Sequence, residues 1–142
     1  MKIAVSSTGG SLDAMVDPRF GRCSYFVIVN VENNEIKDFE AVENPAAMAI
    51  GGAGIQAAQL VANKGVQAVI TGNIGPNAFQ VLSMAGIRIF HGFGTTVKDA
   101  VNRFLRNELE EITSPIRGGG FGPGLGRGFG RGGMGGGRGR ML

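Results

Sequence analysis

The sequence predicts an α/β domain with a mixed five-stranded sheet and three helices, followed by a disordered Gly/Arg-rich tail. Three observations support this fold class. Strand-like apolar segments occur from the start of the chain, segments of helical periodicity appear only from residue 55 onward, and the composition changes abruptly near Pro115. The predicted order of elements is therefore β-β-β-α-β-α-β-α.

The first third of the chain contains strands and no helical pattern. Residues 2–6 are short and apolar, as expected for a buried strand, and residues 7–22 form a connection long enough to suggest a functional or mobile loop. Residues 25–31 are almost continuously apolar, which indicates an interior strand. The Asn33–Asn34 pair suits a hairpin turn because Asn tolerates positive φ. Residues 36–42 mix charged and apolar side chains, so we expect them at a sheet edge.

Helices alternate with strands after a small-residue loop over residues 46–54. Helical periodicity begins at Ile55 and at Pro76, and Gly65 and Gly86 supply the C-terminal stops. The third helix begins after Thr96, where the Thr96–Asp99 spacing is that of a capping box with Asp in place of Glu.

Two further strands, residues 66–70 and 87–90, each return through a helix. Such crossovers are right-handed and join parallel strands. Hairpin links make the first three strands antiparallel neighbours. The predicted sheet order is 3-2-1-4-5 with only the second strand reversed, which is similar to the ribonuclease H-like architecture.

The turn at residues 71–79 (TGNIGPNAF) joins a buried strand to a helix start. Gly72 and Gly75 allow a sharp turn and a close approach to the backbone amides, and Pro76 suits the first helical position. Free N–H groups and the helix dipole favour an anion there. The turn has neither the Walker nor the dinucleotide-binding glycine pattern. A tight connection that binds nothing is the alternative interpretation.

The topology brings several such features to one edge of the sheet. All predicted strands except the second end at this edge, so the long loop, the turn at 51–54, the turn at 71–79 and residues 91–95 converge there. We expect three helix N-termini to face one crevice, the usual ligand position in open α/β sheets. Arg19 and Arg22 of the long loop add positive charge. These features predict an anion-binding crevice.

The charge distribution and the cysteine count limit which kinds of site the chain can form. Residues 1–116 hold nine basic and eleven acidic residues (9 − 11 = −2), so the net charge of +3 comes from the tail. A single cysteine excludes a disulfide or a four-cysteine zinc or iron–sulfur site within one chain. No signal peptide and no apolar run of membrane-spanning length is visible. We expect a cytoplasmic protein with a domain at residues 1–114 and a flexible cationic tail at 115–142.

Four motifs, at residues 17–22, 51–55, 71–78 and 94–97, resemble those of the dinitrogenase iron–molybdenum cofactor biosynthesis family, the group of NifX, NafY and the NifB C-terminal domain. The resemblance covers about residues 1–106. It implies a ribonuclease H-like fold and non-enzymatic carriage or storage of iron–sulfur or molybdenum–iron–sulfur clusters, of thioferrate or thiomolybdate type, in an anaerobic prokaryote. It also implies cluster donor and acceptor proteins as partners. The Gly/Arg-rich tail looks like that of archaeal iron–sulfur storage relatives.

The predicted cluster-binding residues lie on the loop and turns of the crevice. They are Arg19, Phe20, Gly21, Arg22, Gly52, Gly54, Gly72, Asn73, Gly75, Asn77, Gly94 and Thr95. Cys23 and His91 are candidate metal ligands, through a thiolate and a neutral imidazole. For Cys23 the alternative is a small buried residue, and for His91 a turn residue that bonds to the backbone.

The tail, residues 117–142, contains fourteen glycines, no acid and five arginines: Arg117, Arg127, Arg131, Arg138 and Arg140. It cannot build a core. These arginines are predicted to bind anions such as inorganic iron–sulfur species and to promote self-assembly. A plain linker and an RNA-binding segment of the RGG kind are the alternatives. A nuclease has little support, because Asp13 and Asp17 are the only acids near the crevice.

Overall fold

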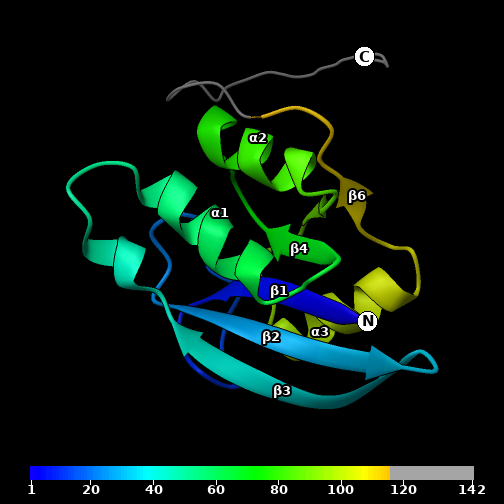
Figure 1. The fold of residues 1–142 in the computed structure, drawn as a ribbon. Helices are drawn as coiled ribbons and strands as arrows, with labels where there is room; N and C mark the ends of the chain where they lie inside the picture. Colours follow the sequence, from blue (N-terminus) through cyan, green and yellow to red (C-terminus); the bar gives the residue numbers. More distant parts are fainter. Residues whose placement is uncertain (116–142) are drawn as a thin grey trace.

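A computed structural model describes residues 1–115 of the 142-residue chain. These residues form one mixed sheet, three α-helices and a short 3-10 turn, arranged as Figure 1 shows. The strands are β1 (Lys2–Ser7), β2 (Tyr25–Glu32), β3 (Glu35–Glu43), β4 (Ala68–Thr71), β5 (Arg88–His91) and β6 (Glu110–Glu111). The helices are η1 (Pro45–Met48), α1 (Ala53–Asn63), α2 (Pro76–Met84) and α3 (Val97–Leu105).

The strand order within residues 1–115 is β3-β2-β1-β4-β5-β6. The predicted order of the first five strands is confirmed, and so is the reversal of β2, which pairs antiparallel with both β1 and β3. Strands β1, β4 and β5 are parallel, as the helical crossovers require. The C-terminal ends of β1, β3, β4 and β5 therefore meet at one edge of the sheet.

The prediction of five strands is wrong by one, because β6 adds to the sheet beyond β5. Asn107 takes a positive φ of 60° after α3 and turns the chain back. Glu110 and Glu111 then pair antiparallel with His91 and Phe90. Two acidic residues carry no hydrophobic periodicity, so the sequence contains no strand signal there.

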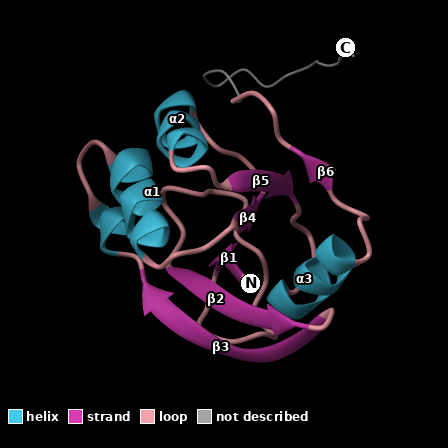
Figure 2. Cartoon of the chain, turned by 45° about the vertical axis from the view of Figure 1, so that its right-hand side comes forward, coloured by secondary structure: helices cyan, strands magenta, loops and turns pink. Residues whose placement is uncertain are grey.

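The helices cover both faces of the sheet (Figure 2). Helices α1 and α2 pack side by side on one face, over a core that includes Phe26, Val69 and Leu82. Helix α3 lies on the opposite face, over a second core that includes Val5 and Ile70. The two helices that follow the small-residue loop and the 71–79 turn are therefore neighbours, and α3 is not.

The loop before α1 is shorter than predicted. Residues 46–54 are expected to be a loop, but Pro45–Met48 form a 3-10 turn whose first turn is capped by the Asn44 side chain, which accepts from the Ala46 N–H at 3.1 Å. Helix α1 then begins at Ala53, two residues before the predicted start at Ile55. A glycine within the first turn, Gly54, conceals this start in the sequence.

The tail predictions fall outside the described residues. The anion binding by the five tail arginines and the expected self-assembly therefore stay predictions, and so does the domain boundary between residues 114 and 115. Among the residues that the structure describes, no helix has the length and apolar character that crossing a membrane requires.

Candidate functional site

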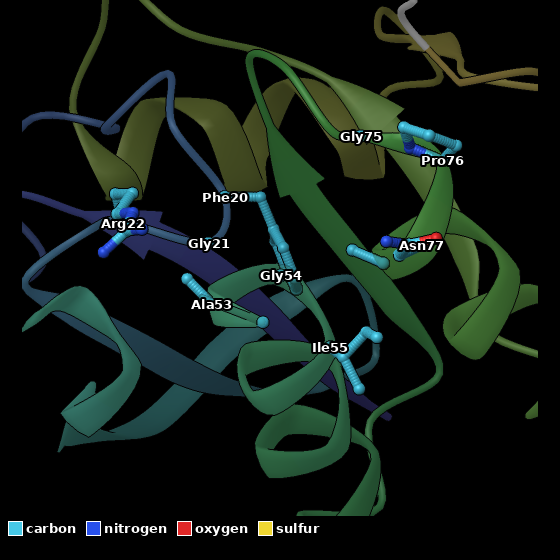
Figure 3. A pocket seen from close by; sticks show the side chains of 11 residues that line it. Phe20, Gly21, Arg22, Ala53, Gly54, Ile55, Gly75, Pro76 and Asn77 are labelled. Carbon is cyan, nitrogen blue, oxygen red and sulfur yellow. The ribbon is translucent and has the colours of Figure 1, made fainter. Parts of the chain in front are cut away.

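A pocket of about 340 Å³ lies where the first turns of α1 and α2 meet the loop Phe20–Arg22. A second hollow of about 350 Å³ adjoins it and shares Phe20, Gly21, Arg22, Gly75 and Pro76 with it. We call the two hollows together the recess. Figure 3 shows Arg22 and the Gly75–Asn77 turn on opposite sides of the pocket, with Ala53–Ile55 between them. The remaining lining residues are Arg19, Gly52, Asn73, Ile74 and Ala78.

The first residues of two helices, α1 and α2, line the pocket. The N-cap residues of α1 and α2 are Gly52 and Gly75, and neither has a side chain that could cap the helix. Neither first turn contains an acidic residue. The first-turn N–H groups have no partner within their own helix and lie at the positive end of its dipole. With no acid among its lining residues and two arginines at its edge, the recess suits an anion.

The N-terminus of α3 differs in both place and chemistry. Thr96 caps it by accepting from the Asp99 N–H at 3.1 Å, and Asp99 places a carboxylate in the first turn. The Thr95 hydroxyl donates to this carboxylate at 2.6 Å. Gly94 and Thr95 are absent from the lining of both hollows. The expectation that three helix N-termini face one crevice is therefore wrong for α3, which caps itself on the other face of the sheet.

Two of the predicted glycines shape the recess through close backbone contacts. A Cβ on Gly72 would lie 2.7 Å from the Cα of Pro18, so Gly72 lets the long loop cross the end of β4. Gly72 does not line the recess; its role is to hold the loop. A Cβ on Gly75, in contrast, would meet no atom within 4 Å, which leaves its position open to the recess.

Arg22 braces the segment that precedes α1. Its Nη1 donates to the carbonyl oxygens of Ala47 at 3.2 Å and Ala49 at 2.5 Å. These are carbonyls at the end of the 3-10 turn, where cations are stabilising. Arg22 also lines both hollows, so one guanidinium fixes the loop and contributes charge to the recess.

Arg19 is held by Asp17 in a two-point ion pair. Its Nε donates to Oδ1 and its Nη2 to Oδ2, each at 3.1 Å, and its backbone N–H donates to Oδ1 at 2.9 Å. Burial alone raises the pKa of the Asp17 carboxyl, but the hydrogen bonds and charge of Arg19 outweigh burial and hold this pKa below its usual value. Asp17 is thus a buried carboxylate that accepts hydrogen bonds from Arg19 and holds its guanidinium in place.

Cys23 lies in the core beneath the recess. The residue is 0% exposed, and its thiol donates to the Phe20 carbonyl at 3.3 Å. Burial raises the pKa of the thiol to about 12, so it stays protonated at neutral pH. A metal ligand must be a thiolate that the metal can reach. In the described conformation Cys23 is a small packed residue, and its role as a metal ligand stays a prediction.

His91 lies apart from Cys23 and from the recess. It ends β5, pairs with Glu110 of β6, and its ring contacts that of Phe93 edge-on at 5.4 Å between centroids. It does not line either hollow. Across residues 1–115, no group of three or more His, Cys, Asp or Glu side chains could hold a metal ion. Its role as a metal ligand is still only a prediction.

Sequence reasoning missed residues that contribute through the backbone or from behind the recess. Ala53, Ile55 and Ala78 line the pocket at the first turns of α1 and α2, although none of them was among the predicted binding residues. Asn44 donates to the carbonyls of Gly21 at 3.2 Å and Cys23 at 2.8 Å and so ties the long loop to β3. An Asn followed by Pro was the available signal for this cap.

Comparison with known proteins shows one matching family model, related sequences and solved structures of similar fold. A family model described as dinitrogenase iron-molybdenum cofactor matches residues 1–107. A Methanocaldococcus jannaschii protein described as uncharacterized is 40% identical over 112 residues, 79% of this chain and 92% of that protein. The apo orange protein from Desulfovibrio gigas has a TM-score of 0.73 at 41% identity, over 80% of this chain and 94% of that one. A Thermotoga protein that carries the NifB label has a TM-score of 0.72 at 38% identity, over 83% and 98% of the two chains.

Proposed function

This chain belongs to the dinitrogenase iron–molybdenum cofactor family, and from that premise we propose that it binds and carries a metal–sulfur anion in the recess, without transforming it. The resemblance of its four motifs to that family is confirmed. The proposed cargo is a small cluster or thiometallate that brings its own sulfide ligands, of thiomolybdate or thioferrate type. The proposed partners are proteins that donate and accept this cargo.

One observation carries the proposal: two uncapped helix N-termini and two arginines surround a recess with no acid in its lining. Sulfide ligands on a metal carry negative charge and accept hydrogen bonds. Backbone N–H groups and guanidinium groups supply both complements. A volume of about 340 Å³ is at the small end of ligand sites, which suits a compact inorganic anion.

The donor set supports a noncovalent cradle. A protein that ligates iron directly offers several thiolates or imidazoles. Here the one cysteine is buried and protonated, and the one histidine lies outside the recess. The proposed cradle therefore depends on neither group. An anion whose metal is already saturated by sulfide needs no protein ligand, and only needs its charge matched.

The test is anaerobic binding of tetrathiomolybdate, measured by equilibrium dialysis and molybdenum analysis. Arg19→Gln combined with Arg22→Gln should weaken binding at least tenfold. The matched control is Arg88→Gln with Arg106→Gln, which removes the same charge from exposed ion pairs outside the recess and should bind as wild type does. Equal losses in both variants would indicate binding by net charge alone. Unchanged binding in the recess variant would show that the anion is held elsewhere.

Carriage by the folded domain leaves a separate role for the tail. We propose that its five arginines raise local affinity for thioanions through long-range charge. Storage of larger iron–sulfur assemblies would rest on the tail, and so would the RNA-binding alternative. The recess offers that alternative no support, since it lacks the exposed aromatic platform on which unpaired bases stack.

A further inference from the structure

We propose that Asp17 is a positioning residue that holds the Arg19 guanidinium at the mouth of the recess, so that loss of this acid weakens anion binding. The inference rests on the proposed function and deepens it. Its direction is unusual, because an acid beside an anion site would ordinarily be expected to weaken binding. Three sets of contacts on the loop support it: those of its backbone, the close approach at Gly72, and the Asp17–Arg19 side-chain pair.

The backbone around Arg19 is fixed on both sides. The Asp17 N–H donates to the Ser6 carbonyl at 2.8 Å, and the Ser6 hydroxyl donates to the Asp17 carbonyl at 2.6 Å. On the other side, the Asn73 N–H donates to the Pro18 carbonyl at 2.6 Å, and the Phe20 N–H donates to the Asn73 carbonyl at 3.3 Å. The loop is thus clamped between the end of β1 and the turn before α2.

The loop and the turn before α2 can approach each other this closely because residue 72 is a glycine. Gly72 faces Pro18 with no room for a side chain, because a Cβ at position 72 would lie 2.7 Å from the Cα of Pro18. The Ser6 hydroxyl also lies 2.8 Å from that of Thr71, which joins β1 to β4 directly beneath the loop. Residue 19 therefore leaves the backbone at a fixed place beside the recess.

The side chains complete the positioning. The Asp17 side chain is 4% exposed and that of Arg19 is 64% exposed, so the carboxylate is anchored inside while the guanidinium reaches outward. Asp17 engages Nε and Nη2 of a group that has five N–H donors. Three donors (5 − 2) are left for another acceptor. Arg19 lines the second hollow, where such an acceptor would lie.

Two explanations of Asp17 predict opposite results. By charge alone, Asp17→Asn removes a negative charge next to an anion site and should tighten binding. By positioning, the same change releases a long side chain that must lose its rotamer freedom again when the anion binds. The structure favours positioning, because the two-point geometry holds the guanidinium in one orientation and Asn can accept only one of its side-chain bonds.

The experiment is a double-mutant cycle with tetrathiomolybdate as the probe. Wild type, Asp17→Asn, Arg19→Gln and the double variant are compared by anaerobic dialysis, with melting temperatures to verify that each is folded. Glu40→Gln is the matched control, since it removes one acid from an exposed pair with Lys64 at the far end of α1. We expect roughly tenfold weaker binding for Asp17→Asn than for wild type. The double variant should bind no more weakly than Arg19→Gln alone, and the control should bind as wild type does.

Each outcome decides the matter. Equal or tighter binding by Asp17→Asn, while wild type binds, overturns the positioning role and leaves the proposed function standing. A loss that persists undiminished in the Arg19→Gln background overturns it too, because Asp17 would then act on the loop as a whole. Absence of wild-type binding, with or without the variants, overturns the proposed function and this role together.

Discussion

Gly21 lies against the first turn of α1 so closely that a Cβ on it would come within 3.0 Å of the Gly54 amide nitrogen. A glycine thus sets the distance between the arginine-bearing loop and one of the two uncapped helix N-termini. Gly54 in turn packs against α2, since its own Cβ would lie 3.3 Å from that of Ala78. Two glycines thus let three backbones approach one another beside the recess.

Gly21→Ala should therefore widen the recess as well as destabilise the fold. Its methyl group meets backbone atoms that cannot rotate away, so we expect a loss of roughly 1–3 kcal/mol in the free energy of unfolding and weaker tetrathiomolybdate binding. Urea denaturation and dialysis measure the two effects. Gly51→Ala is the control, because a Cβ there meets nothing within 4 Å. Equal effects at both positions would contradict the close-packing explanation.

Cys23 should behave as an inert core thiol. Because burial raises its pKa to about 12, iodoacetamide at pH 8 should leave it unmodified in the native protein and alkylate it only after unfolding, as mass spectrometry would show. Cys23→Ala should keep most of the tetrathiomolybdate binding, at a cost of about 1 kcal/mol in stability. Rapid native alkylation, or complete loss of binding in the alanine variant, would mean that the thiol reaches the anion.

The sequence predicted the helices and the order of the first five strands, but it missed β6 and wrongly counted the N-terminus of α3 among those facing the crevice. Hydrophobic patterning revealed β1, β2, β4, β5 and the three helices, because each of those elements has buried residues. No residue of β3 is buried, and its prediction came from the hairpin turn and the mixed charged and apolar pattern of residues 36–42. Hydrophobic patterning could not reveal β6, which rests on backbone pairing of two acids. For the site, the glycines and arginines pointed to the right edge of the sheet. The self-capping of α3 was visible as Thr96 and Asp99, and it argued against a third anion-binding terminus.

Stability should depend on the ionisation of Asp17. Its folded-state pKa is lowered, so the paired carboxylate contributes stability that is present above its unfolded pKa of about 3.9 and is lost as the pH falls through the folded value. Asp17→Asn removes this contribution. Urea denaturation from pH 7 to pH 3 should show wild type losing stability relative to the variant below about pH 4. A constant difference between the two proteins would show that the charge of Asp17 is not what stabilises the loop.

Truncation after Pro115 should leave the domain intact and change its response to salt. All periodic apolar segments end by Leu109, so the melting temperature of residues 1–115 should nearly equal that of the full chain.

Thioferrate-induced light scattering should require the tail and weaken above about 0.1–0.2 M salt, since screening then acts over short distances. Tail-dependent binding to RNA together with indifference to thioferrate would instead support the RNA alternative. A loss of cooperative unfolding would show that the domain needs the tail.

Gly75→Val should separate binding from stability. Gly75 has φ −80° and ψ 173°, which other residues adopt readily, and a Cβ there would meet nothing within 4 Å. The fold should therefore tolerate valine at a cost of about 0.5–1 kcal/mol, since glycine is preferred over valine at an N-cap. Yet Gly75 lines both hollows, so the isopropyl group would occupy the space beside the first-turn N–H groups of α2.

We accordingly expect Gly75→Val to weaken tetrathiomolybdate binding by about tenfold, an order of magnitude that corresponds to losing about one hydrogen bond to a charged group. Gly51→Val provides the matched control, since Gly51 is equally open but lines neither hollow. Dialysis and thermal melts on both variants give the comparison. If Gly75→Val binds as tightly as Gly51→Val and both variants are folded, the anion does not lie against the start of α2, and the recess is not its site.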